Sequence, residues 1–124
     1  MDSLALHNAD SKAALTKMVL RLFALWQIPV IDQAALLGRS TRSIHRYMDG
    51  GRIGDDKEIH ARIGSMLGIH KCLRILYPYN RDLVYLWVTT ENKAFNSQTP
   101  IEVMKSGFEG ILVVRRYLES SCEY

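Results

Sequence analysis

The chain is poor in cysteine and has no long apolar run, and each shortage excludes a class of protein. Its 124 residues include only Cys72 and Cys122, with no CxxC pair and no zinc-finger spacing, so neither a disulfide framework nor a structural zinc site is expected. No apolar stretch approaches the ~20 residues of a membrane span. The first residues lack the basic start and long apolar centre of a signal peptide. These features predict a cytoplasmic protein.

The sequence also lacks a recognisable set of catalytic or metal-binding residues. Its histidines show no i,i+4 pairing, and His60 and His70 would lie about 15 Å apart along a helix. The acidic residues around position 56 are typical of the first turn of a helix. The glycine-rich segment 50–54 lacks the lysine and the spacing of a phosphate-binding loop. An enzyme is therefore the least favoured function, and we expect no cofactor and no metal.

Apolar residues recur at helical spacing through most of the chain, and no strand-like alternation persists, so the pattern predicts an all-α fold. The expected helices lie at about 12–28, as a pair within 30–48, and at 55–76, 81–88, 100–105 and 110–119. The first helix has an apolar stripe, and the short helix at 81–88 presents Leu83, Leu86 and Trp87. That first stripe consists of Leu15, Met18, Val19, Leu22, Phe23 and Trp26. Gly64 and Gly68 interrupt the third segment, where they either weaken the helix or let another helix approach. The break at 77–80 predicts two lobes, 12–76 and 80–124.

Residues 30–48 read as two short helices joined by a tight turn at Gly38. Ser40 is a good N-cap for the second helix, which buries Ile44 and Tyr47. The first helix is expected to turn Ile31, Ala34, Ala35 and Leu37 toward the core. This pattern resembles the helix-turn-helix of DNA-binding repressors, with Ala34, Gly38 and Ile44 at its alanine, glycine and aliphatic positions. The alternative is an ordinary pair of short helices in a bundle.

The outward side of the second helix carries a dense set of groups that can contact nucleic acid. Arg42 and Arg46 are the candidate base readers, since arginine can bridge two acceptors of guanine. Arg39, Thr41 and Ser43 are expected to contact phosphate or base edges, and His45 fits either role. Residues 10–52 carry seven basic and three acidic side chains, a net charge of +4 within a chain of +3. One such helix contacts few base pairs, so a homodimer or a higher assembly is expected.

The segment 87–118 carries a second motif, whose spaced residues are Trp87, Asn92, Phe95, Thr99, Pro100, Glu102, Met104, Gly107 and Val114. Phe95 stands alone in a polar loop, where it either fills a pocket of its own core or docks into a partner. As a set, these residues resemble the C-terminal toxin-binding domain of the Xre/MbcA/ParS antitoxin family, which usually follows an Xre-like helix-turn-helix. Two positions depart from the family pattern: Asn96-Ser97 stand where glycines are common, and Glu91 where proline is common.

The resemblance implies an antitoxin that pairs with a RES-domain toxin, an NAD-consuming protein. Family antitoxins block the toxin's active-site cleft with their C-terminal domain and repress their own operon through the N-terminal half. Carried over here, the toxin-facing residues come from the loop at 92–95 and from the last helix and tail. They are Asn92, Lys93, Phe95, Arg115, Glu119, Glu123 and Tyr124. The polar tail at 120–124 either enters the cleft or is a frayed end.

Two other functions compete with this interpretation. One is a plain transcriptional repressor whose C-terminal lobe serves only for dimerisation. The other is an interaction module whose helix-turn-helix no longer binds DNA. Co-purification of a toxin would separate an antitoxin from the repressor, and salt-dependent DNA binding would separate it from the module.

Overall fold

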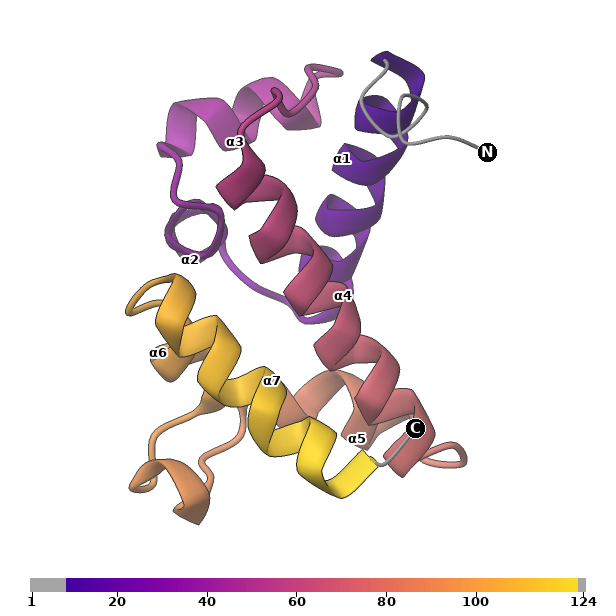
Figure 1. The fold of residues 1–124 in the computed structure, drawn as a ribbon, viewed down its shortest axis with the longest axis vertical. Helices are drawn as coiled ribbons and strands as arrows, with labels where there is room; N and C mark the ends of the chain where they lie inside the picture. Colours follow the sequence, from indigo (N-terminus) through magenta and orange to yellow (C-terminus); the bar gives the residue numbers. More distant parts are fainter. Residues whose placement is uncertain (1–8, 123–124) are drawn as a thin grey trace.

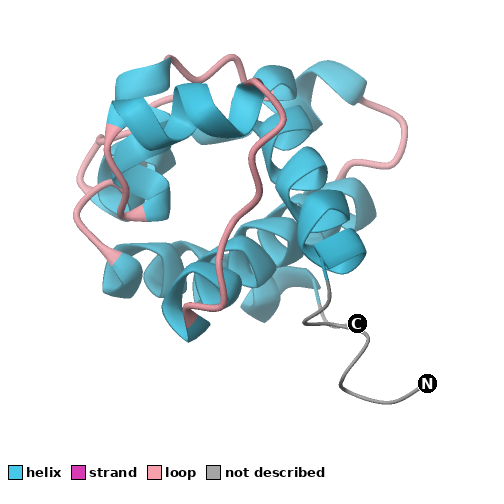
Figure 2. Ribbon diagram, turned by 90° about the horizontal axis from the view of Figure 1, so that it is seen from above, coloured by secondary structure: helices cyan, strands magenta, loops and turns pink. Residues whose placement is uncertain are grey.

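The computed structural model describes residues 9–122, and within that range it contains helices and connecting turns but no strand (Figure 2). The all-α prediction is therefore confirmed. None of the helices in this range has the length and apolar character needed to cross a bilayer. The helices are α1 (Ala9–Leu25), α2 (Val30–Leu37), α3 (Thr41–Met48), α4 (Lys57–Leu76), α5 (Arg81–Leu86), the 3₁₀ helices η2 (Trp87–Thr89) and η3 (Lys93–Phe95), α6 (Pro100–Met104) and α7 (Phe108–Cys122).

Helix α1 buries most of the stripe that the periodicity predicted. Val19, Leu22 and Phe23 are buried, and Trp26 enters the core just beyond the last helical residue. Met18 was expected in the same stripe, but its side chain is 51% exposed. That prediction is wrong because Met18 borders an open groove between α1 and α4 that no other element fills.

Helix α2 buries Ala34 and Leu37, as expected, but not Ile31. Ile31 is 70% exposed, while Leu36 and Leu37 are fully buried, so the expectation for Ile31 is wrong. Pro29 is the N-cap of α2, which places Ile31 in the first turn on the side away from the core. Gln33 takes a buried position, and its amide donates a hydrogen bond of 2.9 Å to the carbonyl of Ile28. This bond satisfies a polar donor inside an apolar region.

Helix α4 contacts helices of both lobes (Figure 1). It begins at the N-cap Asp56, whose carboxylate accepts a hydrogen bond of 2.9 Å from the Glu58 amide, and it runs unbroken through Gly64 and Gly68. Its first half contacts α1 and α2, and its second half packs along α7. Gly68 faces the Arg115 side chain of α7 so closely that a Cβ there would lie 3.2 Å from the guanidinium. Of the two alternatives given by the sequence, Gly68 therefore fits the second: it lets another helix, α7, approach closely.

The C-terminal lobe is formed around the corner between α6 and α7. Thr99 caps α6, and its hydroxyl accepts from the Glu102 amide while the Glu102 carboxylate accepts from the Thr99 amide, a capping box. Helix α7 starts at Phe108 and ends at Cys122, two and three residues beyond the expected limits. In α5 and η2 the buried residues are Val84 and Val88, whereas Leu83 and Leu86, which the sequence pattern singled out, are exposed.

A single cluster of buried side chains extends through both lobes, from Val19 to Cys122. Cys72 and Cys122 belong to it, and these two buried cysteines are not joined in a disulfide. An ion pair of 2.9 Å between Lys105 of the α6 C-cap and Asp32 of α2 adds a second contact between the lobes.

Candidate nucleic-acid interface and partner-binding surface

The turn between α2 and α3 has the geometry that its residues predict. Gly38 adopts the left-handed conformation (φ +66°, ψ +37°), where a side chain would be strained and would meet the Arg62 guanidinium at 3.1 Å. Two residues later, the hydroxyl of Ser40 accepts a hydrogen bond of 3.1 Å from the Ser43 amide and starts α3. The chain therefore ends one helix and begins the next within three residues.

Helix α3 is held at a fixed orientation by its apolar side. Ile44 is fully buried and Tyr47 is 4% exposed, as predicted. Beneath α2, the buried guanidinium of Arg62 donates a hydrogen bond of 3.1 Å to the carbonyl of Leu36 and forms an ion pair with Glu58. Arg62 thus satisfies a carbonyl at the end of α2 and anchors the motif to α4. Sequence reasoning missed this role, although the i,i+4 spacing of Glu58 and Arg62 was a signal.

The opposite side of α3 is open to solvent. Thr41, Arg42, His45 and Arg46 are exposed, and Ser43 is half-buried. Within residues 9–122, Arg42 and Arg46 form no ion pair with a carboxylate. The guanidinium of Arg46 lies 4.9 Å from the centre of the Tyr47 ring, a cation–π contact that limits its rotation without neutralising its charge. The face therefore presents two arginines whose charge is available to a phosphate or a base edge.

Arg39 differs from the other predicted cations because a carboxylate holds it. Its guanidinium donates to Asp56 at 2.8 Å, and this contact raises the pKa of Arg39 and lowers the pKa of Asp56. The bond fixes the start of α3 against the N-cap of α4. Arg39 is consequently a weaker candidate for phosphate binding than Arg42 or Arg46.

A cationic cleft that the sequence did not predict lies at the other end of α3. Arg46 and Arg52 line it together with Lys12, which pairs with Asp55, and its volume is about 480 Å³. A hydrogen bond of 3.1 Å from the Ile53 amide to the Thr16 hydroxyl fixes this loop against α1. The excess of basic residues in segment 10–52 was the only signal of such a site. The cleft extends the positive surface from α3 to the start of α1.

In the C-terminal lobe, three aromatic rings form a contact set, the aromatic cluster, made of Trp87, Phe95 and Tyr117. The rings of Phe95 and Tyr117 lie 5.2 Å apart edge to face, and Tyr117 stacks on Trp87 at 6.3 Å. Phe95 is 8% exposed, so of the two alternatives it fills a pocket of its own lobe. Tyr117 remains 41% exposed, and the apolar side chains of Val113 on α7 and of Leu83 and Leu86 on α5 are exposed as well.

The loop that precedes α6 accounts for one of the two departures from the family pattern, the absence of glycine at Asn96-Ser97. Asn96 and Ser97 both have positive φ, +57° and +66°, the conformation in which glycine is least strained. Asparagine tolerates this region better than other residues, and the Asn92 carboxamide oxygen braces the turn by accepting from the Ala94 amide at 2.9 Å. The loop is therefore closed without glycine, and it leaves Lys93 exposed at its tip.

The remaining predicted toxin-facing residues take two positions. Arg115 and Glu119 form an i,i+4 ion pair of 3.1 Å on α7, and Arg115 also donates to the Ser65 hydroxyl of α4 at 3.3 Å. The Arg115 side chain therefore takes part in the contact between α7 and α4 and is only partly exposed. Glu123 and Tyr124 lie outside the described residues.

The histidines and acids do not converge on a metal site in the part of the chain that the structure describes. His60 bonds to the carbonyl of Gly54 at 2.8 Å, and His70 stacks on Tyr85. The candidate sites described above consist of exposed cations at one end of the molecule and exposed apolar groups at the other.

Comparison with known families agrees with this division. Residues 5–58 match the model of the antitoxin Xre-like helix-turn-helix domain, and residues 72–120 match the antitoxin Xre/MbcA/ParS C-terminal toxin-binding domain. No curated protein matches the chain. The first match contains α2 and α3, and the second contains the aromatic cluster.

Proposed function

This chain belongs to the Xre/MbcA/ParS family of antitoxins, and we propose that it neutralises a RES-domain toxin and represses its own operon. In this proposal the C-terminal lobe covers the active-site cleft of an NAD-consuming toxin, while α3 enters the major groove of operator DNA. Both contacts use surfaces that are exposed in the free chain.

The DNA contact is supported by the charge and exposure of α3. Arg42 and Arg46 lie on one exposed face beside a capped helix start, with no carboxylate pairing them among the described residues. In helix-turn-helix proteins the first turns of the second helix reach base edges, which is where Arg42 stands. Thr41, Ser43 and His45 flank it, and Arg46 with Arg52 would follow the adjacent phosphates. Two-fold operator sites favour a homodimer, which we include in the proposal.

Removing both arginines tests this contact. The Arg42→Ala/Arg46→Ala variant should lose at least about tenfold in operator affinity and show a shallower dependence on salt, since phosphate contacts release counterions. The Arg74→Ala/Arg81→Ala variant removes the same charge from the far end of the molecule and should bind DNA like the wild type. Mobility-shift titrations at several salt concentrations give both quantities. Equal operator affinity for the wild type and the α3 variant would contradict the DNA-binding proposal.

The toxin contact is supported by the exposed apolar groups around the aromatic cluster. Three exposed apolar side chains, those of Tyr117, Leu86 and Val113, would lose contact with water if a partner covered them. Aromatic residues commonly carry the binding energy of protein interfaces. Asn92, Lys93 and the acidic or cationic side chains of α7 would form the polar rim. In a rival scheme the same surface joins two copies of the chain in a plain repressor.

Changing the exposed apolar groups tests the toxin contact. Leu86→Asp and Val113→Asp should each weaken toxin binding by about tenfold or more, because a carboxylate would be desolvated against an apolar partner. Ile31→Asp is the matched control, since Ile31 is an exposed apolar residue of the other lobe. Co-purification with the toxin encoded beside this gene, and protection of NAD from that toxin, provide the measurements. If no toxin co-purifies with the wild type and the aspartate variants become monomeric, the repressor scheme is correct.

A further inference from the structure

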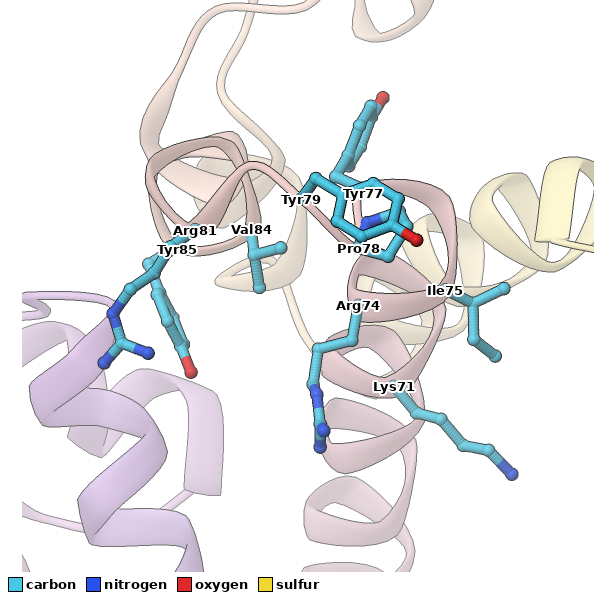
Figure 3. Close-up of a pocket in the computed structure, with 9 residues that line it drawn as sticks. All are labelled: Lys71, Arg74, Ile75, Tyr77, Pro78, Tyr79, Arg81, Val84 and Tyr85. Carbon is cyan, nitrogen blue, oxygen red and sulfur yellow. The ribbon is translucent and has the colours of Figure 1, made fainter.

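An open cleft between the end of α4 and α5 shares no lining residue with the two surfaces described above. Its volume is about 620 Å³, within the ~300–1,000 Å³ typical of small-molecule sites. The turn at 77–80 forms one wall of the cleft, with Arg74 contributed by α4 and Arg81 and Tyr85 by α5 (Figure 3). In Figure 3 these three side chains extend toward the same side.

The charge lining the cleft is of one sign. Lys71, Arg74 and Arg81 contribute cations, and no acidic side chain among residues 9–122 lines the cleft. Within residues 9–122, neither Arg74 nor Arg81 forms an ion pair. Arginine forms paired hydrogen bonds with phosphate oxygens, so two arginines beside one opening favour an anion with several oxygens.

Aromatic side chains give the cleft a second kind of contact. The Arg81 guanidinium lies 5.0 Å from the centre of the Tyr85 ring, and Tyr85 in turn stacks on His70 at 5.4 Å, so Arg81 is held in position before any ligand arrives. Tyr79, next to Pro78 in the turn, is 99% exposed. A phenol ring with this exposure is available to stack on a planar group.

We propose that this cleft binds a free nucleotide, with its phosphates on Arg74 and Arg81 and its base stacked on Tyr79. A nucleoside di- or triphosphate combines the two groups that the lining recognises, several phosphate oxygens and a flat aromatic ring. An inorganic anion would use only the arginines, and a nucleoside would use only the tyrosine. The proposal is independent of the DNA and toxin contacts because it shares no residue with either.

Calorimetric titration of the full chain at fixed salt tests the site, with ADP, pyrophosphate and adenosine as separate probes. We expect ADP to bind more tightly than pyrophosphate or adenosine. Arg74→Ala/Arg81→Ala should weaken ADP binding by about tenfold or more. Tyr79→Ala should weaken ADP by about fivefold or more and leave pyrophosphate unchanged. All of these side chains are on the surface of the cleft, and the unfolding midpoint of each variant establishes that it folds.

The Arg42→Ala/Arg46→Ala variant is the matched control, because it removes two exposed arginines elsewhere and should bind ADP like the wild type. Absence of ADP binding up to about 1 mM would overturn the proposal. So would equal affinities for ADP and pyrophosphate together with no effect of Tyr79→Ala, since the cleft would then be a plain anion patch. A single-stranded oligonucleotide that binds more tightly than ADP and loses affinity in the Arg74/Arg81 variant would assign the cleft to nucleic acid instead.

Discussion

His70 is a half-buried histidine whose surroundings oppose its protonation. Its ring stacks on Tyr85, and its buried Nδ1 has no hydrogen-bond partner among the described residues. Burial, and then the positive charge of Arg74, lower the pKa of His70 below its usual 6.5. Protonation therefore favours the unfolded chain, in which the histidine titrates normally. Stability should be constant above about pH 6.5 and fall as the pH drops below that value, until the folded-state pKa is reached.

The variant His70→Phe should remove most of this pH dependence, because phenylalanine keeps the stacked ring and cannot be protonated. Denaturant unfolding at about pH 7.5 and about pH 5.5 gives the measurement. His45→Gln is the matched control, since it removes a histidine that is exposed on α3. If the wild type and His70→Phe lose the same stability between the two pH values, the acid sensitivity originates elsewhere.

At the same scale, the sequence predicted residues whose role depends on their immediate neighbours. Ser40, Gly38 and Ile44 took the predicted positions because a cap, a left-handed turn and a buried β-branched side chain are local requirements. The contacts of Arg62 with Leu36 and of Arg39 with Asp56 were not predicted, since the partners lie 26 and 17 residues away. Ile31 was misassigned because an apolar residue in a first helical turn can face either way.

Among the elements, the corner between α6 and α7 depends on one glycine. A Cβ at Gly110 would overlap the carbonyl oxygen of Val103 and lie 2.6 Å from the Ser106 hydroxyl. The backbones of the two helices can approach only because this side chain is absent. Gly110→Ala should therefore lower the free energy of unfolding by about 1–3 kcal/mol, as overpacking typically does. Urea denaturation monitored by circular dichroism gives the value.

Gly64 provides the opposite control within α4. A Cβ there would meet nothing within 4 Å, and the residue lies inside a continuous helix. Gly64→Ala should raise the free energy of unfolding by about 0.5–1 kcal/mol, because alanine loses less backbone entropy on folding. Similar effects of the two substitutions would show that the α6–α7 contact does not depend on close backbone approach.

Element boundaries were predictable where a cap marked them and less so elsewhere. Thr99-Pro100 placed the start of α6 because the Thr99 side chain satisfies a free amide in the first turn. Helix α4 begins at Lys57, two residues after the expected start at 55, because Asp56 is its N-cap and not a residue of its first turn. Helix α7 extends past both predicted ends, where no capping side chain signals a limit. The continuity of α4 through Gly64 and Gly68 results from its packing against other helices, which local sequence does not reveal.

In the whole molecule, the two lobes share α4 and one core, although the sequence divides them at 77–80. The buried cluster runs from α1 to α7, and Arg115 links α7 to Ser65 in the middle of α4. The proposed DNA and toxin surfaces are thus at separate ends of a single packed body. The sequence indicated both surfaces through local motifs, but their relative placement depends on contacts between residues up to 50 positions apart.

A shared core predicts that the lobes unfold together. Trp26 is fully buried in the N-terminal lobe, and Trp87 belongs to the aromatic cluster of the C-terminal lobe, so each tryptophan reports on one lobe. The variants Trp26→Phe and Trp87→Phe each keep one tryptophan. In each variant we expect the fluorescence transition in urea to coincide with the loss of helical circular dichroism, as for a two-state domain. A fluorescence midpoint that precedes the loss of helix in one variant and follows it in the other would mean that α4 connects two independently folding units. Coincidence would instead mean that toxin binding at one end raises the unfolding free energy of the DNA-binding end as well, because a ligand stabilises every part of a cooperative unit.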